Sequence, residues 1–207
     1  MTDTAAPAPV SAPAPVPTAE RPDRFREGAG RLCLDFIRTL RYRGTPAETE
    51  ELADPAALAD WVRQFGTAAG TEPSVPPLDV AQVREARALR EAVYALVAAA
   101  MSGDRVGPAA RRRLNDAAAA PVPVPRLTPS GTVAMSAESP LAALMSLVAR
   151  DALDLATSPA LLTRVRPCAS PTCGALFLDH SRPGTRRWCS MDICGNRAKK
   201  AGLRARA

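Results

Sequence analysis

The sequence predicts a mainly α (α+β) protein, in which a helical N-terminal domain with a small β-hairpin precedes a small C-terminal module. Three observations lead to this fold class. Several long segments have apolar residues at every third or fourth position, which is the spacing of one buried helix face. Alternation around a turn signal is confined to residues 121–136. Four of the five cysteines lie between residues 168 and 194, which sets the C-terminal segment apart.

The beginning of the chain divides into a leader and two predicted helices. Residues 1–22 contain six prolines and six alanines and few branched apolar side chains, so we expect a disordered leader. Folded structure is expected to begin near Phe25, and the apolar segment that ends at Leu40 is expected to be helical. A second helix should begin at Asp54-Pro55, an N-cap followed by proline at the first helical position, and end at Gly66.

The most regular helix is expected to run from Asp79 to Gly103. Gln82 stands three residues after Asp79, as in a capping box, and the apolar stripe continues until Gly103, a typical C-terminal stop. A shorter helix should follow Pro108 and continue to Ala120.

The next stretch, residues 121–136, is expected to form a small edge hairpin. It is rich in proline, which cannot donate to a central strand ladder, and it contains the turn signal Pro129-Ser130-Gly131. Another helix should start at Ser139-Pro140 and end at Ser158-Pro159. These elements make up a predicted domain of residues 24–160, which we expect to fold without the module of residues 164–207.

The positive charge of the chain is concentrated in its last segment. Residues 164–207 have a net charge of +8, whereas residues 1–163 have a net charge of −2. This asymmetry is typical of a segment that binds a polyanion, and a solvated basic tail is the alternative. The longest strongly apolar run, residues 92–101, has about half of the ~20 residues that a membrane helix needs. No signal-peptide pattern precedes the fold, so we expect a cytoplasmic protein without membrane spans.

The clustered cysteines form two pairs with equal spacing. Four residues separate Cys168 from Cys173 and Cys189 from Cys194, and fifteen residues separate the pairs. Two close pairs can supply four tetrahedral ligands to one structural Zn²⁺. A bound metal would also explain how a segment with so few apolar residues folds. Redox-active or merely buried cysteines are the alternative.

The single histidine argues against catalysis. His180 lies inside the cysteine-rich module, where four cysteines complete a site without it, so we expect it at the surface or beside the ligands. A catalytic Ser-His-Asp or Cys-His set would have to use this residue, and no enzyme activity is expected. Cys33, between Leu32 and Leu34, is expected to be a core residue.

Local patterns place the cysteine pairs on a treble-clef-like layout. Residues 165–168 and 176–179 can form two short strands with a turn between them. Ser190 can cap a helix toward Arg206, with Cys194 in its first turns. Basic side chains on this helix and the loop before it are candidate phosphate contacts: Arg186, Arg187, Arg197, Lys199, Lys200 and Arg204. Of these, Arg197, Lys200 and Arg204 share one helix face.

Two parts of the sequence resemble known families. The string RRWCSMDICGNRAKK resembles the CGNR zinc finger, named for the motif that stands here at residues 194–197, and CASPTCGALFLDHSRPGTRRWC is similar to its upstream half. The strings RLCLDFIRTL and DPAALADWV resemble the ABATE domain, which usually precedes this finger. The resemblance implies a bacterial, stress-induced transcription regulator.

The leading functional hypothesis is therefore a regulator that binds duplex DNA through the finger, while the helical domain senses a small-molecule effector or forms a homodimer. RNA binding by the same surface, a protein-interaction or thiol-redox module, and an enzyme in the N-terminal domain are the alternatives. Trp188 can stack on a base, but we expect it in the finger's own core. Asn196 is expected to hold the finger together, and Arg197 can do the same or contact phosphate.

Overall fold

The computed structural model describes residues 24–68 and 75–204 and confirms a mainly helical fold with small two-stranded sheets. The predicted leader, residues 1–22, lies outside the described residues. The elements follow one another as α1 (Leu32–Ile37), β1 (Leu40–Arg41), β2 (Thr49–Glu50), α2 (Pro55–Ala68), α3 (Val80–Ser102), α4 (Pro108–Ala119), β3 (Val124–Leu127), β4 (Val133–Ser136), α5 (Pro140–Thr157), α6 (Pro159–Leu162), β5 (Val165–Pro167), β6 (Leu176–Leu178), the π-helical turn η1 (Met191–Gly195) and α7 (Asn196–Arg204).

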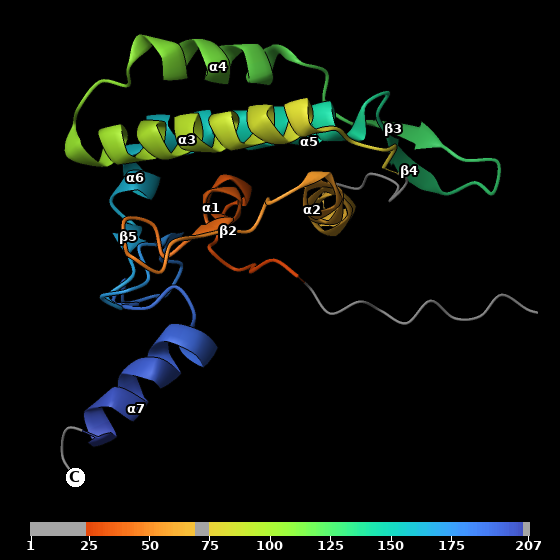
Figure 1. The fold of residues 1–207 in the computed structure, drawn as a ribbon. Helices are drawn as coiled ribbons and strands as arrows, with labels where there is room; N and C mark the ends of the chain where they lie inside the picture. Colours follow the sequence, from red (N-terminus) through yellow and green to blue (C-terminus); the bar gives the residue numbers. More distant parts are fainter. Residues whose placement is uncertain (1–23, 69–74, 205–207) are drawn as a thin grey trace, which may run out of the picture.

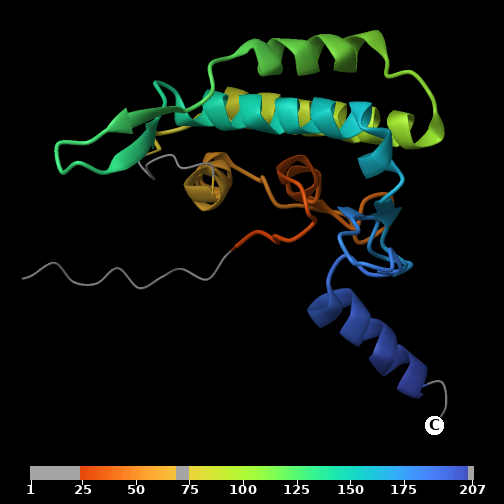
Figure 2. The ribbon, with the colours of Figure 1, turned by 180° about the vertical axis from the view of Figure 1, so that it is seen from behind.

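The helices are arranged in layers around α3 and α5. Figures 1 and 2 show these two long helices side by side, with α4 over one face and α1 and α2 under the other. The apolar stripe of α5 is completely buried at Leu144, Val148, Ala152 and Leu155. The module with β5, β6 and α7 lies below the layers, at the end where α5 gives way to α6.

The helix boundaries follow from capping groups that the sequence displays. The carboxylate of Asp79 accepts the Gln82 backbone N–H at 2.8 Å, and the Gln82 side chain accepts the Asp79 N–H at 2.8 Å. Gly103 ends α3 with a φ of 73°, the left-handed conformation that glycine adopts without a steric penalty. At α5 the Ser139 hydroxyl accepts the Ala142 N–H. The predicted starts of both helices are thus confirmed.

Two predicted helix ends were wrong. Helix α2 continues through Gly66 to Ala68, because Trp61 and Phe65 stack at 4.9 Å in the core and this packing outweighs the cost of one helical glycine, about 1 kcal/mol. Helix α1 ends at Ile37, so Leu40 lies in strand β1 instead of in the helix. The strands β1 and β2, of two residues each, carry no alternation that a sequence pattern could reveal.

The β1–β2 hairpin is fixed to α3 by ion pairs. Arg90, whose side chain is 3% exposed, donates to both carboxylate oxygens of Glu50 at 2.6 and 2.7 Å. Burial alone would raise the pKa of Glu50, but the hydrogen bonds and charge of Arg90 bring that pKa below its usual value. Arg41 binds Glu51 at 2.6 Å in the same hairpin. This hairpin therefore stands on a rigid support beside the C-terminal module.

The C-terminal module shares one continuous apolar core with the helices. Val165, Phe177 and Leu178 belong to the same buried cluster as Phe36 of α1 and the residues of α5. The Leu178 N–H also donates to the carbonyl of Ala29 at 2.7 Å, just before α1. Folding of residues 24–160 and 164–207 as separate units stays a prediction.

Candidate metal centre and nucleic-acid interface

The first cysteine pair lies in the turn between β5 and β6. These strands pair antiparallel, with Val165 opposite Leu178 and Pro167 opposite Leu176. The Cys168 N–H donates to the Ala175 carbonyl at 2.8 Å and so closes the turn. Gly174 has a φ of +64°, and a Cβ at this position would lie 2.7 Å from the carbonyl oxygen of Arg43. Only glycine fits here, because the β1–β2 connection presses against the turn.

The second pair reaches the same place from the opposite side. The Ala169 N–H donates to the Arg187 carbonyl at 2.8 Å, which ties the incoming loop to the first turn. The Cys189 N–H then points to the sulfur of Cys168 at 3.4 Å. Ser190 accepts the Ile193 N–H through its hydroxyl, as predicted for a helix cap, and Cys194 follows inside the π-helical turn η1.

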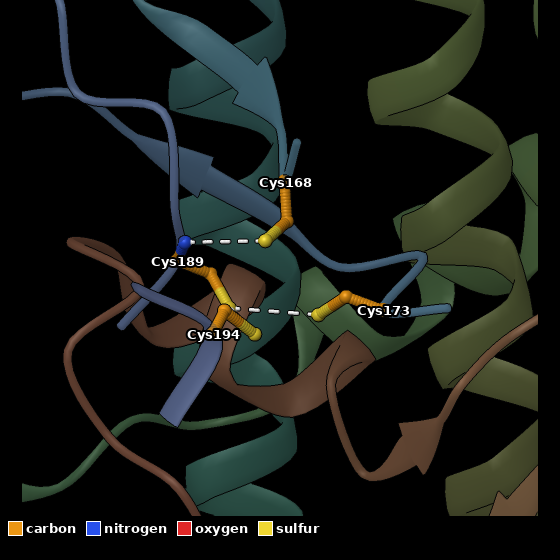
Figure 3. A group of neighbouring side chains, drawn as sticks. All are labelled: Cys168, Cys173, Cys189 and Cys194. Atoms are coloured by element: carbon orange, nitrogen blue, oxygen red, sulfur yellow. Dashed lines mark hydrogen bonds between the residues drawn. The ribbon is translucent and has the colours of Figure 1, made fainter. Parts of the chain in front are cut away.

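The four sulfur atoms converge on one centre (Figure 3). All of them lie within 4.8 Å of one another, and the distances are 3.6 Å between Cys173 and Cys189 and 3.7 Å between Cys189 and Cys194. Four sulfurs at about 2.3 Å from a tetrahedral zinc are separated by about 3.8 Å, whereas a disulfide needs about 2.05 Å. The geometry thus fits a metal and excludes disulfides within this cluster.

The ionisation of the thiols points to the same conclusion. A hydrogen bond from Cys189 lowers the pKa of Cys173 to about 5. The neighbouring Cys173 and burial in turn raise the pKa of Cys189, and burial followed by Cys173 raises the pKa of Cys194 to about 11. Ionisation of Cys173 thus opposes that of its neighbours, and all four thiols become thiolates only around a compensating cation; soft thiolate donors in a tetrahedron select zinc.

Comparison with known families decides the identity of both parts. Residues 30–159 match the ABATE family, described as "Putative stress-induced transcription regulator". The chain belongs to the ABATE family. Residues 164–207 match the CGNR zinc finger, so Cys168, Cys173, Cys189 and Cys194 form one structural Zn²⁺ site. A comparison with curated proteins gives no match. Across residues 24–68 and 75–204, no helix is long and apolar enough to span a membrane.

Arg186, a predicted phosphate contact, is directed into the CGNR finger. Its guanidinium stacks over the Phe177 ring at 4.7 Å and donates to the carbonyl oxygens of Trp188, Cys189 and Gly28. These bonds join the loop that leads to the third zinc ligand to the segment before α1. In the described part of the chain, Arg186 therefore acts as a brace inside the protein.

Arg187 and Trp188 form a surface pair. Arg187 is exposed, and its guanidinium lies 4.7 Å from the centre of the Trp188 ring. Trp188 is partly buried and packs against the core cluster, which agrees with the expected role in the finger's core. A cation–π contact of this kind attracts the positive charge of the arginine to the ring and holds it in place, but it does not neutralise that charge.

The other predicted contacts lie on α7. Arg197, Lys199, Lys200 and Arg204 are all exposed, and the helix buries no residue. A shallow surface groove beside η1 and α7 is lined by Arg197, Lys200 and Arg204, so the predicted shared face is confirmed. Among the described ion pairs, none involves a basic side chain of this helix.

The last two residues of the CGNR motif, Asn196 and Arg197, have different surroundings. The Asn196 amide donates to the Asp192 carbonyl at 3.0 Å and so stabilises the junction of η1 and α7, which is a structural role of the expected kind. The guanidinium of Arg197 lies 5.9 Å from the ring centre of Tyr42, a residue of the β1–β2 connection with the uncommon φ of 54°. Arg197 is thus in contact with the ABATE domain and also exposed to solvent.

Sequence reasoning missed two residues that shape this site. Asp179 is completely buried, and its carboxylate accepts the N–H groups of Ser181 and Arg186, both at 2.9 Å. An aspartate directly before a Ser/Pro/Gly loop is a turn signal that could have revealed this role. Arg38, the second missed residue, is buried at the end of α1, the helix whose preceding segment is bonded to Leu178 of the finger; its sequence neighbours give no indication of this burial. His180 is exposed, as expected, and faces the Gly30 carbonyl at 3.3 Å.

Proposed function

We propose that this ABATE protein is a transcription regulator that binds duplex DNA through its CGNR finger. The observation that carries the proposal is the position of α7. This basic helix begins directly after the zinc ligand Cys194 and projects away from the helical layers (Figures 1 and 2). A zinc site at its start fixes its direction, while none of its residues is buried.

The charge of α7 suits a polyanion. Its nine residues include four cations and no acidic residue. Each cation that neutralises a phosphate releases condensed counterions, which is the main source of affinity for nucleic acid. The groove beside the helix contains one carboxylate, that of Asp192. It lies at the start of the helix, where it also favours the helix dipole.

The dimensions of α7 agree with those of a duplex groove. An α-helix with its side chains is about 10–12 Å across, and the nine residues of α7 extend for about 14 Å along the helix axis. The major groove of B-DNA is about 12 Å wide and accepts one α-helix, whereas the deep groove of duplex RNA is too narrow for side chains. Single-stranded RNA stays an alternative target, because the exposed pair of Arg187 and Trp188 offers a surface on which a base could stack.

A competition experiment tests this proposal. Zinc-loaded protein bound to a labelled DNA duplex is titrated with unlabelled duplex DNA and with single-stranded RNA of equal length. The proposal expects duplex DNA to compete better. Preference for the RNA would support the RNA-binding alternative. If the protein bound neither the labelled duplex nor the RNA, the protein-interaction alternative would move ahead.

We also propose that the ABATE domain binds a small-molecule effector between α3, α4 and α5. A cavity of about 650 Å³ lies there, within the range of about 300–1,000 Å³ of small-molecule sites. Ala86, Leu89 and Met145 give it an apolar wall, and the ion pair of Glu85 with Arg113 stands at its rim. This pattern suits an amphipathic ligand.

The fluorescent probe 1-anilinonaphthalene-8-sulfonate tests the effector site. The probe should bind the folded protein, and Ala117→Phe, which fills the cavity, should weaken this binding at least tenfold. Ala119→Phe is the matched control, since Ala119 is exposed on the same helix and does not line the cavity. Equal binding by both variants would contradict the assignment. A homodimer, a cytoplasmic location and the absence of enzyme activity stay predictions.

A further inference from the structure

The finger exposes two large apolar side chains. Among its described residues, 164–204, Leu203 is 68% exposed and Met191 is 48% exposed. Packing in the core explains neither of them, because α7 buries no residue and has its main contact with η1. A single exposed apolar side chain needs no explanation, but apolar side chains that gather on one surface indicate a binding site. It therefore matters whether Leu203 and Met191 lie on the same side of the helix.

Met191 and Leu203 do lie on the same side of α7. The Met191 side chain covers Gly195, since a Cβ at Gly195 would be 2.9 Å from the sulfur of Met191. Gly195 directly precedes α7, and residues four apart in a helix lie one above the other on the same face. Lys199 and Leu203 thus continue the row that begins with Met191 at Gly195. All three side chains of this α7 row (Met191, Lys199 and Leu203) are exposed.

The α7 row lies beside the cations of the groove. Arg197, Lys200 and Arg204 line the groove, whereas Lys199 and Leu203 do not. Residues three apart are neighbours on a helix surface, so Lys200 lies next to Leu203. The helix therefore presents two adjacent stripes, one cationic and one with two apolar side chains.

A helix in the major groove meets two kinds of surface. Phosphates line the edges of the groove, and base edges form its floor. Thymine presents an apolar group there, the C5 methyl, and apolar side chains contact it in protein–DNA complexes. When the cationic stripe of α7 is directed to the phosphates, the adjacent row is turned toward the floor.

We propose that the α7 row contacts the bases of the duplex, with Leu203 and Met191 against thymine methyl groups and Lys199 donating to a base-edge acceptor between them. Eight residues separate Gly195 from Leu203, about 12 Å along the helix, which corresponds to about three base pairs. This inference rests on the proposed DNA binding and adds to it a preference for sites that contain thymine.

Replacement of thymine by uracil tests this inference, because uracil lacks only the C5 methyl and leaves the charge of the duplex unchanged. The probes are a duplex of alternating dA and dT and the same duplex with dU in place of dT. One methyl group against an apolar side chain contributes about fourfold in affinity. The zinc-loaded wild type should therefore bind the thymine duplex about 10–20-fold more tightly than the uracil duplex.

Substitutions in the row should reduce this preference. Leu203→Ala should lower it to about fourfold, and Met191→Ala/Leu203→Ala should abolish it. Neither variant removes a charge, so the salt dependence of binding should stay that of the wild type. The matched control is Leu127→Ala, because Leu127 is 75% exposed on the β3–β4 hairpin, away from α7. This control should keep the full preference.

Failure of the inference and failure of the proposed function give different results. A wild type that does not bind the thymine duplex would contradict DNA binding itself. Equal binding of both duplexes with a steep salt dependence, or a full preference retained in Leu203→Ala, would overturn the contacts of the row and leave DNA binding in place. If Leu203→Ala separated a dimer in light scattering, the row would be a contact between two copies of the chain, which would also overturn the inference.

Discussion

The helical layers and the CGNR finger are stabilised by different means. In the layers, α3 and α5 bury long stripes that are mainly Leu, Val and Ala, and α5 alone contributes nine buried residues. Among the described residues of the finger, 164–204, the buried apolar side chains other than cysteine are Val165, Leu176, Phe177 and Leu178. Apolar area therefore suffices for the layers, whereas the finger needs a metal to order its loops.

The contacts between these two regions determine how far the effect of the metal extends into the ABATE domain. The finger is joined to the ABATE domain by the bond of Leu178 to Ala29, by the tight approach of Gly174 to Arg43, and by Arg186 reaching Gly28. All these partners lie near α1 and the β1–β2 connection. We infer that α1 responds to the metal, while α3 and α5 do so far less.

Removal of zinc should produce the largest difference in stability between the finger and the helical layers. Structural zinc contributes on the order of 10 kcal/mol to small fingers, so chelation, or Cys194→Ser, should unfold residues 164–204. Hydrogen exchange should then show full loss of protection in β5 and β6, partial loss in α1, and retained protection in α3 and α5. Cys33→Ser should keep its zinc, because Cys33 is buried in the helical core away from the cluster. Simultaneous loss of protection in all helices would show that the chain is one cooperative unit.

A cavity introduced into the helical layers by mutation should destabilise the layers and leave the zinc affinity of the finger almost unchanged. Leu144 is completely buried in the middle of α5, and Leu144→Ala should lower the free energy of unfolding by about 2–5 kcal/mol. Urea unfolding of the zinc-loaded protein measures this loss. Zinc affinity in the absence of denaturant should change little. A large fall in zinc affinity would mean that the finger depends on the whole domain and not mainly on α1.

The ion pair of Glu50 with Arg90 tests the support of the β1–β2 hairpin. Glu50→Gln leaves the buried guanidinium without its main partner and should cost roughly 1–3 kcal/mol at pH 7. Because Arg90 lowers the pKa of folded Glu50, this stabilisation is present above the unfolded pKa of about 4.3 and disappears as the pH falls through the lower folded value. Melting temperatures of the wild type and Glu50→Gln should therefore converge below about pH 4. A constant difference down to pH 3 would contradict this account.

The features of the fold and the site that depend on local sequence signals could be predicted from the sequence. The capping box of Asp79 and Gln82 and the hairpin in residues 121–136 were predicted correctly, and so was the convergence of the four clustered cysteines on one site. The course of α2 through Gly66 was not, because the packing of Trp61 and Phe65 decides it. The bracing of the finger by Arg186 was not foreseen either, since its partners Phe177 and Gly28 come together only in the folded chain. Positive charge alone cannot distinguish an arginine that faces solvent from one that holds a loop.

The salt dependence of duplex binding tests the central claim, that the finger presents α7 to the DNA backbone. Arg186 is engaged inside the protein, and Lys199 does not line the groove beside α7. Four exposed cations remain as expected contacts: Arg187, Arg197, Lys200 and Arg204. The log–log slope of affinity against salt should be about −3.6, at −0.9 per phosphate contact. Lys200→Ala/Arg204→Ala should reduce its magnitude by about 1.8, with no change in melting temperature beyond about 1 °C.

The matched control for this measurement is Arg105→Ala/Arg111→Ala, which removes the same charge from exposed positions at the start of α4 and in the loop before it, outside the cavity and away from α7. We expect an unchanged slope for this control and the smaller slope for the α7 variant. Identical slopes for the wild type and both variants would show that α7 does not touch the duplex.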